Sequence, residues 1–432
     1  MKSKGIYLGI CLIIVILFVT ILLRTIPKEP KQGQAQTESI LPYGDYLPDS
    51  ENPTIRVVLK TQGFEHITHP KAVVSAFGGL EISTGETFVE SQAGEQICIN
   101  PDDQRFQSGT IWIEPKVAGE HITIHSYNRG YGTPSYRGRI ELFATAEGIV
   151  IVNELPLEEY LCAVVPSEMP ASYASEALKC QAVCARSYAH NQMLSFSYPQ
   201  YQAHVDDSVA FQVYGNSKEQ ESTTAAVRET TGQKLWYQNR VVTTYYYSTS
   251  CGKTTDVEAW GTKKNEANGY LQGISISNEE GKDYEAALPW YRWTAVIDGK
   301  TLCNLIESNT KKNLGTLQSV TVTKQGAGGI ALQIVATGSK GKVTVNTENK
   351  IRAALGGGGY EIQKQDGTTV KSSKLLPSAF FSIAKNAGNY IIKGGGYGHG
   401  IGMSQNGANE MAKVGKTYNE ILQFFYPGTK VK

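Results

Sequence analysis

Short runs of alternating apolar and polar residues fill the chain from residue 54 to residue 148. Alternation with a period of two places successive side chains on opposite faces of a strand, and glycine-containing turns separate the runs. The pattern predicts a β-rich accessory domain over residues 54–148. Its expected strands span 55–59, 72–77, 110–113, 121–125 and 139–143.

The pattern changes after residue 148. An apolar strand over 149–152 leads to Pro156, and proline is favoured at the first position of a helix. The periodicity predicts a helix over 157–165, which Pro166 ends because proline cannot donate the helical hydrogen bond. A second helix is expected over 175–194, with small residues along one face. Strands and helices mixed in this way predict an α+β catalytic domain over residues 149–432.

The remainder of this domain also mixes both kinds of element. Residues 234–247 predict a hairpin that turns at Gln238 and Asn239. Mixed strands and two short helices are expected over 261–387, which we interpret as an insertion or subdomain. One strand pair surrounds residues 325–329, and one helix lies near 347–355. A glycine-rich segment and two helices finish the chain, and Thr417 with Glu420 forms a capping box at the last helix.

An uncharged apolar segment occupies residues 6–23. Eighteen residues at ~1.5 Å each extend about 27 Å, enough to cross the core of a bilayer. Arg24 and Pro27 follow it, where a cleaved signal peptide has small residues. We therefore expect residues 1–24 to be a cytoplasmic tip with a transmembrane anchor, and the proline-rich residues 25–53 to be a flexible stalk. Basic residues flank the segment on both sides, so charge does not orient it.

Charge and cysteine content narrow the function classes. The 432 residues include 41 basic and 40 acidic side chains, and the net charge is +1 with no block of one sign. Electrostatic attraction to nucleic acid is therefore not indicated. Six of the seven cysteines lie outside the apolar segment. Cys180 and Cys184 are one helical turn apart and are interpreted as small packing residues, so we expect the cysteines to be reduced rather than to hold zinc.

Glu168 is the only charged residue in the segment 165–170, between Pro166 and Pro170. The prolines restrict the backbone, and a carboxyl beside their rings and Met169 is expected to be partly desolvated. Desolvation disfavours the anion and raises the pKa, as a general acid requires near neutral pH. The local sequence alone leaves an exposed loop glutamate as the alternative.

Two further segments carry groups suited to binding sugars. A row of hydroxyls ends the second hairpin strand, and a glycine-dense segment over 394–405 lets the backbone approach a ligand closely. Neither the dinucleotide fingerprint nor the P-loop spacing is present. The candidate sugar-binding residues are Tyr246, Ser248, Thr249, Ser250, His399, Ser404 and Gln405, with Tyr397 as a second candidate for stacking on a sugar face.

Together these segments resemble the stage II sporulation protein D (SpoIID) family of bacterial cell-wall enzymes. The matching runs are 152, 157–161, 165–170, 176–179, 181–183, 185–188, 206–207, 212–215, 248–252, 398–408 and 426–429. The resemblance is close over about 149–260 and 390–430 and loose between them. It implies a fold of SpoIID type and a lytic transglycosylase that cuts peptidoglycan glycan strands, preferably strands without stem peptides. The family's catalytic glutamate falls on Glu168.

The resemblance also implies a cellular setting. The family acts at the septum during engulfment in spore-forming bacteria, alongside a cell-wall amidase and membrane engulfment proteins. It places the bulk of the chain outside the cytoplasm, attached to the cell membrane by one N-terminal helix. Some members carry a His/Cys metal site, but His204 here lacks a cysteine partner. We therefore expect no metal and no other cofactor.

Four other interpretations remain open at this stage. Cys251 as nucleophile with His399 as base would make a thiol amidase or peptidase, and Ser250 with Lys253 matches the first part of a serine-enzyme motif. A non-catalytic glycan-binding or scaffold protein would use Glu168 only to hold sugar. A hydrolase, rather than a transglycosylase, would need a second carboxylate, for which Asp206 and Asp207 are the candidates.

Overall fold

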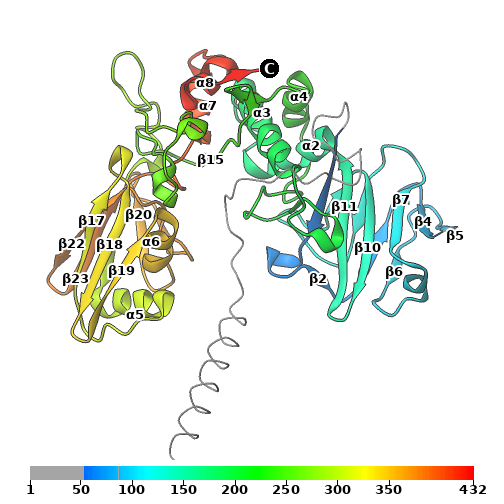
Figure 1. Cartoon of the computed structure of the whole chain (residues 1–432), viewed down its shortest axis with the longest axis horizontal. Coiled ribbons are helices and arrows are strands. Elements are labelled where there is room, and N and C mark those ends of the chain that lie inside the picture. The colour runs from blue at the N-terminus through cyan, green and yellow to red at the C-terminus, as the bar shows by residue number, and fades with distance from the viewer. Residues whose placement is uncertain (1–52, 86) are drawn as a thin grey trace, which may run out of the picture. The chain divides into compact units, whose positions relative to one another are not determined.

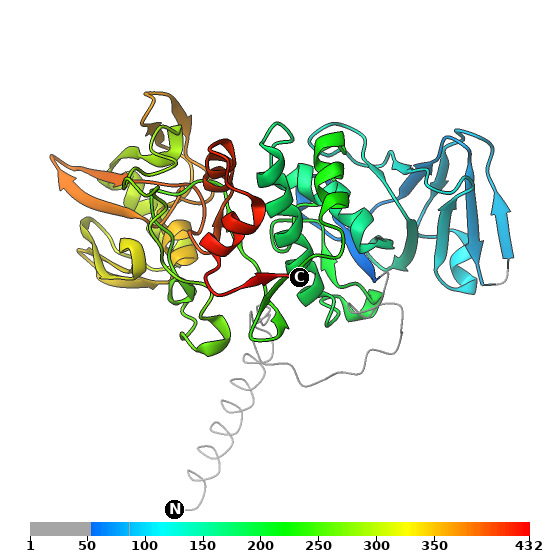
Figure 2. The same ribbon diagram turned by 90° about the horizontal axis from the view of Figure 1, so that it is seen from above.

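A computed structural model describes residues 53–85 and 87–432. The predicted membrane anchor over 1–24 and the predicted stalk up to residue 52 lie outside this part of the chain. Within the part described, no helix combines the length and apolar character needed to cross a membrane. This part contains several sheets and seven α-helices, so the predicted α+β class is confirmed for it (Figures 1 and 2).

The largest sheet has the strand order β12-β1-β11-β10-β7-β4-β5, and β2 also pairs with β11. Strand β11 is antiparallel to both β1 and β10, and all its residues except the last are buried. The sheet therefore contains strands from both sides of the predicted boundary at residue 148, and the division into accessory and catalytic domains stays a prediction. Its strands are β1 (Thr54–Leu59), β2 (Thr68–His69), β4 (Leu80–Thr84), β5 (Thr87–Glu90), β7 (Ile111–Pro115), β10 (Arg139–Thr145), β11 (Gly148–Pro156) and β12 (Val205–Asp206).

A second sheet in the same region has the order β6-β3-β8-β9. Its strands are β3 (Ala72–Ser75), β6 (Ile97–Ile99), β8 (Ile122–Ile124) and β9 (Ser135–Tyr136). All the strands expected before residue 148 are found, as β1, β3, β7, β8 and β10. Of the strands that were not expected, β2, β6 and β9 have at most three residues, and β5 exposes every one of its residues. A strand without a buried face has no apolar alternation from which to predict it. The fifth, β4, does alternate buried and more exposed residues, and the sequence analysis missed it.

Helix α2 (Leu157–Glu168) continues through Pro166, so the prediction that this proline ends the helix is wrong. Pro166 removes one N–H donor, but the next turn still closes, because Met169 N–H bonds to the Val165 carbonyl at 2.9 Å. A proline in the last turn therefore does not break this helix, although it would disrupt a helix interior. As a result Glu168 belongs to the helix and not to a loop that follows it. It is the last residue of α2.

Helix α3 (Ser175–Gln192) is packed on two sides. Ala182 and Ala185 belong to the core shared with the large sheet, whereas Cys180 and Cys184 belong to a second core that includes the C-terminal helices. Small side chains allow this close approach, as the sequence predicted. Helices α7 (Gln405–Lys413) and α8 (Tyr418–Phe425) lie beside α3, and α4 (Glu221–Glu229) packs against α2 and α3 (Figures 1 and 2).

The predicted hairpin is present but its second strand is short. Strands β13 (Leu235–Tyr237) and β14 (Arg240–Val241) are joined through Gln238 and Asn239, whose φ angles of 48° and 61° suit a tight hairpin turn. The strand expected to continue to residue 247 stops at Val241, because Thr244 is drawn to the α3 carbonyl of Cys184 at 2.6 Å. β13 also pairs with β25 (Lys430–Val431).

Strand β15 (Tyr246–Tyr247) instead pairs in parallel with β24 (Met403–Ser404). Tyr246 is aligned with Met403, and Tyr247 with Ser404. This pairing joins the hydroxyl-rich segment to the glycine-rich segment, which are far apart in the sequence. Two of the three segments singled out from the sequence therefore meet through their backbones.

The region between these two strands has its own sheets. One has the order β21-β20-β16-β23-β22 and the other β17-β18-β19. The predicted strand pair around 325–329 and the predicted helix near 347–355 are both found, as β17 with β18 and as α6. The elements are β16 (Trp293–Asp298), α5 (Gly299–Thr310), β17 (Leu317–Gln325), β18 (Ala331–Gly338), β19 (Gly341–Asn346), α6 (Glu348–Leu355), β20 (Glu361–Lys364), β21 (Thr369–Lys371), β22 (Phe381–Asn386) and β23 (Asn389–Gly394). Whether 261–387 is an insertion stays a prediction.

Candidate active site

The three candidate segments converge at the end of helix α2. Gln405, the first residue of α7, donates from its side-chain Nε2 to the main-chain carbonyl of Glu168 at 3.0 Å, and to Oε1 of Gln181 on α3 at 3.2 Å. The parallel pairing of β15 with β24 brings Tyr246 to the same place. Residues 168, 246 and 405, which the sequence proposed separately, are therefore neighbours in one site.

The carboxyl group of Glu168 is held by two donors. The backbone N–H of Val213 donates to Oε1 at 2.7 Å, and the hydroxyl of Tyr246 is hydrogen-bonded to the same carboxyl. Burial raises the pKa of Glu168 from 4.5 to about 7, and these two hydrogen bonds oppose the rise because they stabilise the anion. Glu168 can therefore hold and release a proton near neutral pH, as the sequence analysis expected.

Tyr246 is oriented by a buried chain of hydrogen bonds. Tyr160 donates to Oε1 of Gln212 at 3.3 Å, and Nε2 of Gln212 donates to the Tyr246 hydroxyl at 3.2 Å. Because that hydroxyl accepts from Gln212, its own proton is free to point at Glu168. The sequence analysis missed Gln212 and the Val213 N–H, although both lie in a run that it quoted.

Ser248 and Thr249 lie beside the site and are tied to α7 through Asn406. The backbone N–H and the side-chain Nδ2 of Asn406 both donate to the Ser248 carbonyl at 3.0 Å, and Nδ2 also reaches the Thr249 hydroxyl at 3.0 Å. Tyr173 donates to Oδ1 of Asn406 at 2.7 Å. The Ser248 side chain is half-buried, whereas Thr249 is buried. Ser248 therefore remains the better placed of the two to meet a ligand.

Ser250 and Ser404 are both fully occupied by a buried glutamate that the sequence analysis did not single out. The hydroxyls of Ser250 and Ser404 donate to the carboxyl of Glu285, the second at 2.8 Å, and the Ser250 N–H donates to it at 2.9 Å. Both serines and Glu285 are buried. Ser404 also accepts from the Gly407 N–H at 3.2 Å, so it caps α7 as the sequence predicted. These two hydroxyls hold the fold together and do not face a ligand in this structure.

His399 is locked by its own backbone surroundings. Nδ1 accepts from the Ile401 N–H at 3.1 Å, and Nε2 lies 2.9 Å from the Tyr246 carbonyl. The ring must therefore be neutral with its proton on Nε2, and burial lowers the pKa of His399 to about 3. Neither nitrogen is available as a base for Cys251, and burial raises the pKa of the Cys251 thiol. The structure gives no support to the interpretation as a thiol amidase or peptidase.

The other candidate groups are held in local networks. Asp206 accepts from the N–H and hydroxyl of Ser208 at 2.8 and 2.6 Å, and Asp207 is paired with Arg129. Neither carboxylate is bonded to Glu168 or its partners, so neither is presented as a second catalytic carboxylate. The ring of His204 accepts from the Arg56 N–H at 3.0 Å. Over residues 53–85 and 87–432, no three side chains of His, Cys, Asp or Glu gather as a metal site.

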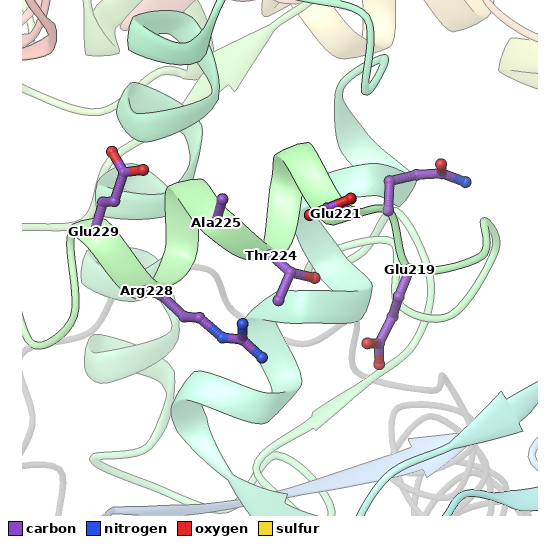
Figure 3. Close-up of a pocket in the computed structure, with 7 residues that line it drawn as sticks. Glu219, Glu221, Thr224, Ala225, Arg228 and Glu229 are labelled. Carbon is purple, nitrogen blue, oxygen red and sulfur yellow. The ribbon is translucent and has the colours of Figure 1, made fainter.

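A pocket on helix α4 lies apart from these groups (Figure 3). Its lining includes Glu219, Glu229 and Arg228, and the figure shows Arg228 extended beside Thr224. Two of the three glutamates that line it, Glu219 and Glu229, are in ion pairs. Glu219 is paired with Arg137 at 2.7 Å, and Glu229 with a lysine of α3 at 2.8 Å. None of the candidate site residues lines this pocket, and we assign no chemistry to it.

Two family models match the chain in sequence. The sequence profile of the family described as Stage II sporulation protein (SpoIID) matches residues 145–237, and that of a domain of unknown function (DUF8618) matches residues 259–402. The chain is 32% identical to Stage II sporulation protein D of Bacillus subtilis (strain 168) over 294 residues, which cover 65% of this chain and 75% of the relative. The counterpart from Bacillus amyloliquefaciens is also 32% identical, over 297 residues, with the same coverage.

A third relative is the protein named Amidase enhancer of Bacillus subtilis (strain 168). It is 31% identical over 287 residues, which cover 62% of this chain and 39% of that protein. The chain thus spans well under half of this relative. The extent of the match to Stage II sporulation protein D shows that the chain belongs to the SpoIID family. Its Glu168, Tyr246 and Gln405 all lie within or next to the runs on which the resemblance was based.

Proposed function

We propose that the chain is a lytic transglycosylase that cleaves the glycan strands of peptidoglycan, with Glu168 as both acid and base. The observation that carries the proposal is the place of the Glu168 carboxyl. It lies where the three family segments meet, and it is held by one backbone N–H and one tyrosine hydroxyl. A carboxyl with a pKa of about 7 can donate a proton at neutral pH and take one back in the next step.

In the first step, protonated Glu168 donates its proton to the glycosidic oxygen as the bond from that oxygen to C1 of the muramic acid breaks. The leaving sugar departs as an alcohol, and positive charge develops on the muramic acid ring. Glu168 is then a carboxylate, which the Val213 N–H and the Tyr246 hydroxyl stabilise. These donors strengthen as negative charge appears, so they favour this step.

In the second step, the Glu168 carboxylate takes the proton from the C6 hydroxyl of the same muramic acid. The C6 oxygen forms a bond to C1 and gives a 1,6-anhydro ring, and Glu168 is protonated again. No water is consumed, so the reaction needs no second carboxylate to activate one. The attacking hydroxyl belongs to the reacting sugar, and this supplies the advantage of proximity. The engagement of Asp206 and Asp207 elsewhere agrees with a single catalytic carboxyl.

The names of the relatives support a setting for this activity. Stage II sporulation protein D and Amidase enhancer point to sporulation and to a cell-wall amidase. We propose that the chain remodels septal wall during engulfment, together with such an amidase and with membrane engulfment proteins. The apolar segment over 6–23 would anchor it in the cell membrane, with residues 53–432 outside the cytoplasm.

The test is cleavage of purified, peptide-free glycan strands by the full-length chain, with the masses of the products determined by mass spectrometry. Fragments that end in anhydro-muramic acid are expected from the wild-type chain, and Glu168→Gln should reduce the rate by roughly 10²–10⁴-fold. Glu221→Gln, at an exposed glutamate of α4, is the matched control and should cleave normally. Fragments one water heavier would show a hydrolase. Strand binding without cleavage by the wild-type chain would show a glycan-binding protein, and undiminished cleavage by Glu168→Gln would refute the assignment.

A further inference from the structure

The largest sheet ends in a strand that has only one neighbour. Within residues 53–85 and 87–432, β5 is the last strand in the order and pairs only with β4, and it lies at the outer border of the sheet (Figure 1). An edge strand presents backbone N–H and C=O groups that no neighbouring strand uses. All four residues of β5 are exposed. This edge of the sheet is therefore open to a further strand.

Large apolar side chains gather at the same edge. Phe88 is 59% exposed and Val89 is 60% exposed, and they lie on opposite faces of β5 because successive side chains of a strand alternate. Phe77 and Val117 are 89% and 49% exposed. These two residues are close together, since a Cβ atom on Gly78 would lie 2.6 Å from Cγ2 of Val117. Exposed apolar side chains that gather in one place indicate an interaction surface, whereas single ones do not.

The turn that carries Phe77 borders the end of β5. A Cβ atom on Gly79 would lie 2.7 Å from the carbonyl oxygen of Ser91, the residue that follows β5. The N–H of Lys116 donates to the carbonyl of Gly79 at 3.0 Å, which places Val117 beside the same turn. Phe77 and Val117 therefore extend the apolar surface beyond the end of β5.

A row of glutamates crosses the sheet to this edge. Glu90 of β5 is aligned with Glu81 of β4, and Glu81 is aligned with Glu114 of β7. Lys116 is paired with Glu90 and Arg139 with Glu114. Glu81, between them, forms no ion pair within the part of the chain that the structure describes. Like charges in directly opposite positions repel each other, so the row favours the approach of a further cation.

Phe88 lies in the next row on the same face of the sheet. It is aligned with Ser83 of β4, and side chains two residues apart along a strand share a face, so Phe88 and Glu90 point the same way. The sequence around them has one sign of charge, because residues 72–104 contain six acidic and no basic side chains. The open edge thus combines an exposed aromatic ring with negative charge.

We propose that β5 accepts an extended segment of a partner protein as an added strand, and that this segment alternates basic and apolar side chains. The free backbone groups of β5 hold the segment by hydrogen bonds. Its basic side chains lie beside Glu90 and over the Phe88 ring, both of which attract a cation. Its apolar side chains cover Val89 on the other face. A second copy of the chain is a poorer occupant, because it brings the same glutamates to the edge.

The test measures binding of three synthetic peptides of eight residues with blocked ends to the full-length chain. One alternates lysine and valine, and the second alternates glutamate and valine. The chain should bind the lysine peptide at least about tenfold more tightly than the glutamate peptide, and the difference should shrink as salt is added. The third is the lysine peptide with every backbone amide N-methylated, which keeps the charge but has no N–H to donate. Its Kd should be higher about tenfold or more.

Two double variants locate the binding on the chain. Phe88→Ser with Val89→Thr should raise the Kd of the lysine peptide about tenfold. Glu81→Gln with Glu90→Gln should raise it by a similar factor and remove most of its dependence on salt. The four side chains are exposed, so the circular dichroism spectrum should not change. Val296→Thr, at an exposed valine of β16, is the matched control and should leave the Kd unchanged.

Each contrary result overturns a stated part of the proposal. Equal affinity for the lysine and glutamate peptides excludes a basic partner, and equal affinity for the N-methylated peptide excludes an added strand. No binding of the lysine peptide at millimolar concentration rejects the whole proposal. A dimer in sedimentation that Phe88→Ser with Val89→Thr abolishes would identify a second copy as the occupant and reject a basic partner. None of these measurements depends on cleavage of glycan, so this proposal and the proposed function stand or fall separately.

Discussion

The side-chain amide of Gln405 donates a hydrogen bond of 3.0 Å to the main-chain carbonyl of Glu168. Glu168 is the last residue of α2, and the final carbonyls of a helix have no partner within the helix. Gln405 supplies that partner from α7, whose residues follow those of α2 by more than half of the chain. A residue first considered as a sugar ligand thus positions the backbone of the proposed catalytic residue.

Gln405→Ala should lower kcat by about 10²-fold, because loss of this contact lets the end of α2 shift relative to Tyr246. It should also cost about 1–2 kcal/mol of unfolding free energy, since a partly buried carbonyl loses its donor. Steady-state cleavage and urea denaturation measure the two effects. Gln318→Ala, at an exposed position of β17, is the control and should alter neither. Wild-type kcat in a folded Gln405→Ala chain would contradict the positioning role.

Cleavage should fall by about tenfold per pH unit above pH 7, because the first step needs protonated Glu168 and its pKa is about 7. Tyr246→Phe removes a hydrogen bond that stabilises the carboxylate, so the pKa of Glu168 should rise. The descending limb of the kcat profile should then move to higher pH by about one unit. Tyr173→Phe removes a hydroxyl that binds Asn406 instead, and its profile should not move. A shift of this limb to lower pH in Tyr246→Phe would show that the Tyr246 hydroxyl does not stabilise the Glu168 carboxylate.

Glu285→Gln should flatten the dependence of stability on pH. Burial raises the pKa of Glu285 from 4.5 to about 7, so the folded chain keeps a proton that the unfolded chain releases in this range. Stability is then highest at acidic pH and falls as pH rises from about 4.5 through 7, by on the order of 3 kcal/mol for this residue. Urea denaturation at pH 5 and pH 8 should show a smaller difference in the variant than in the wild type. An unchanged difference would mean that Glu285 is already ionised in the folded chain.

Cys251→Ser should cleave glycan strands at the wild-type rate, because burial raises the pKa of the thiol and His399 cannot serve as its base. Alkylation of the wild-type chain with iodoacetamide should likewise proceed slowly at pH 7. Complete loss of cleavage by a correctly folded Cys251→Ser chain would restore the thiol enzyme as the better explanation.

Glu168 could be singled out from the sequence because it is the only charged residue beside Pro166, Met169 and Pro170. The groups that hold its carboxyl, the Val213 N–H and the Tyr246 hydroxyl, are distant in the sequence and are brought to it by the fold. The role of Glu285 could not be predicted in this way. Its neighbours in the sequence carry no pattern, and its partners Ser250 and Ser404 are brought to it only by the fold. For the same reason the two serines were expected to face sugars, although their hydroxyls are used inside the protein.

The strands and helices also divide into those that a local pattern predicts and those that depend on contacts between distant segments. The expected helices over 175–194 and 347–355 depend on periodicity within one segment, and both occur. The extent of α2 depended on whether Pro166 could be tolerated, which the hydrogen bonds around Met169 decide. The parallel pairing of β15 with β24 joins segments that have no local signal for each other. Register between distant strands is set by the whole sheet arrangement rather than by either strand.

The site is assembled from segments that leave the ribosome at different times, because β15 pairs with β24 and Gln405 contacts Glu168. Domains generally fold in the order in which they leave the ribosome. Helix α2 and Tyr246 emerge early, but Gln405 follows only after the whole segment 259–402 has been made. A nascent chain therefore carries Glu168 without the hydrogen bond from Gln405, and the activity that we propose would begin only after α7 has been added. Late completion of the site is a built-in delay between translation and activity.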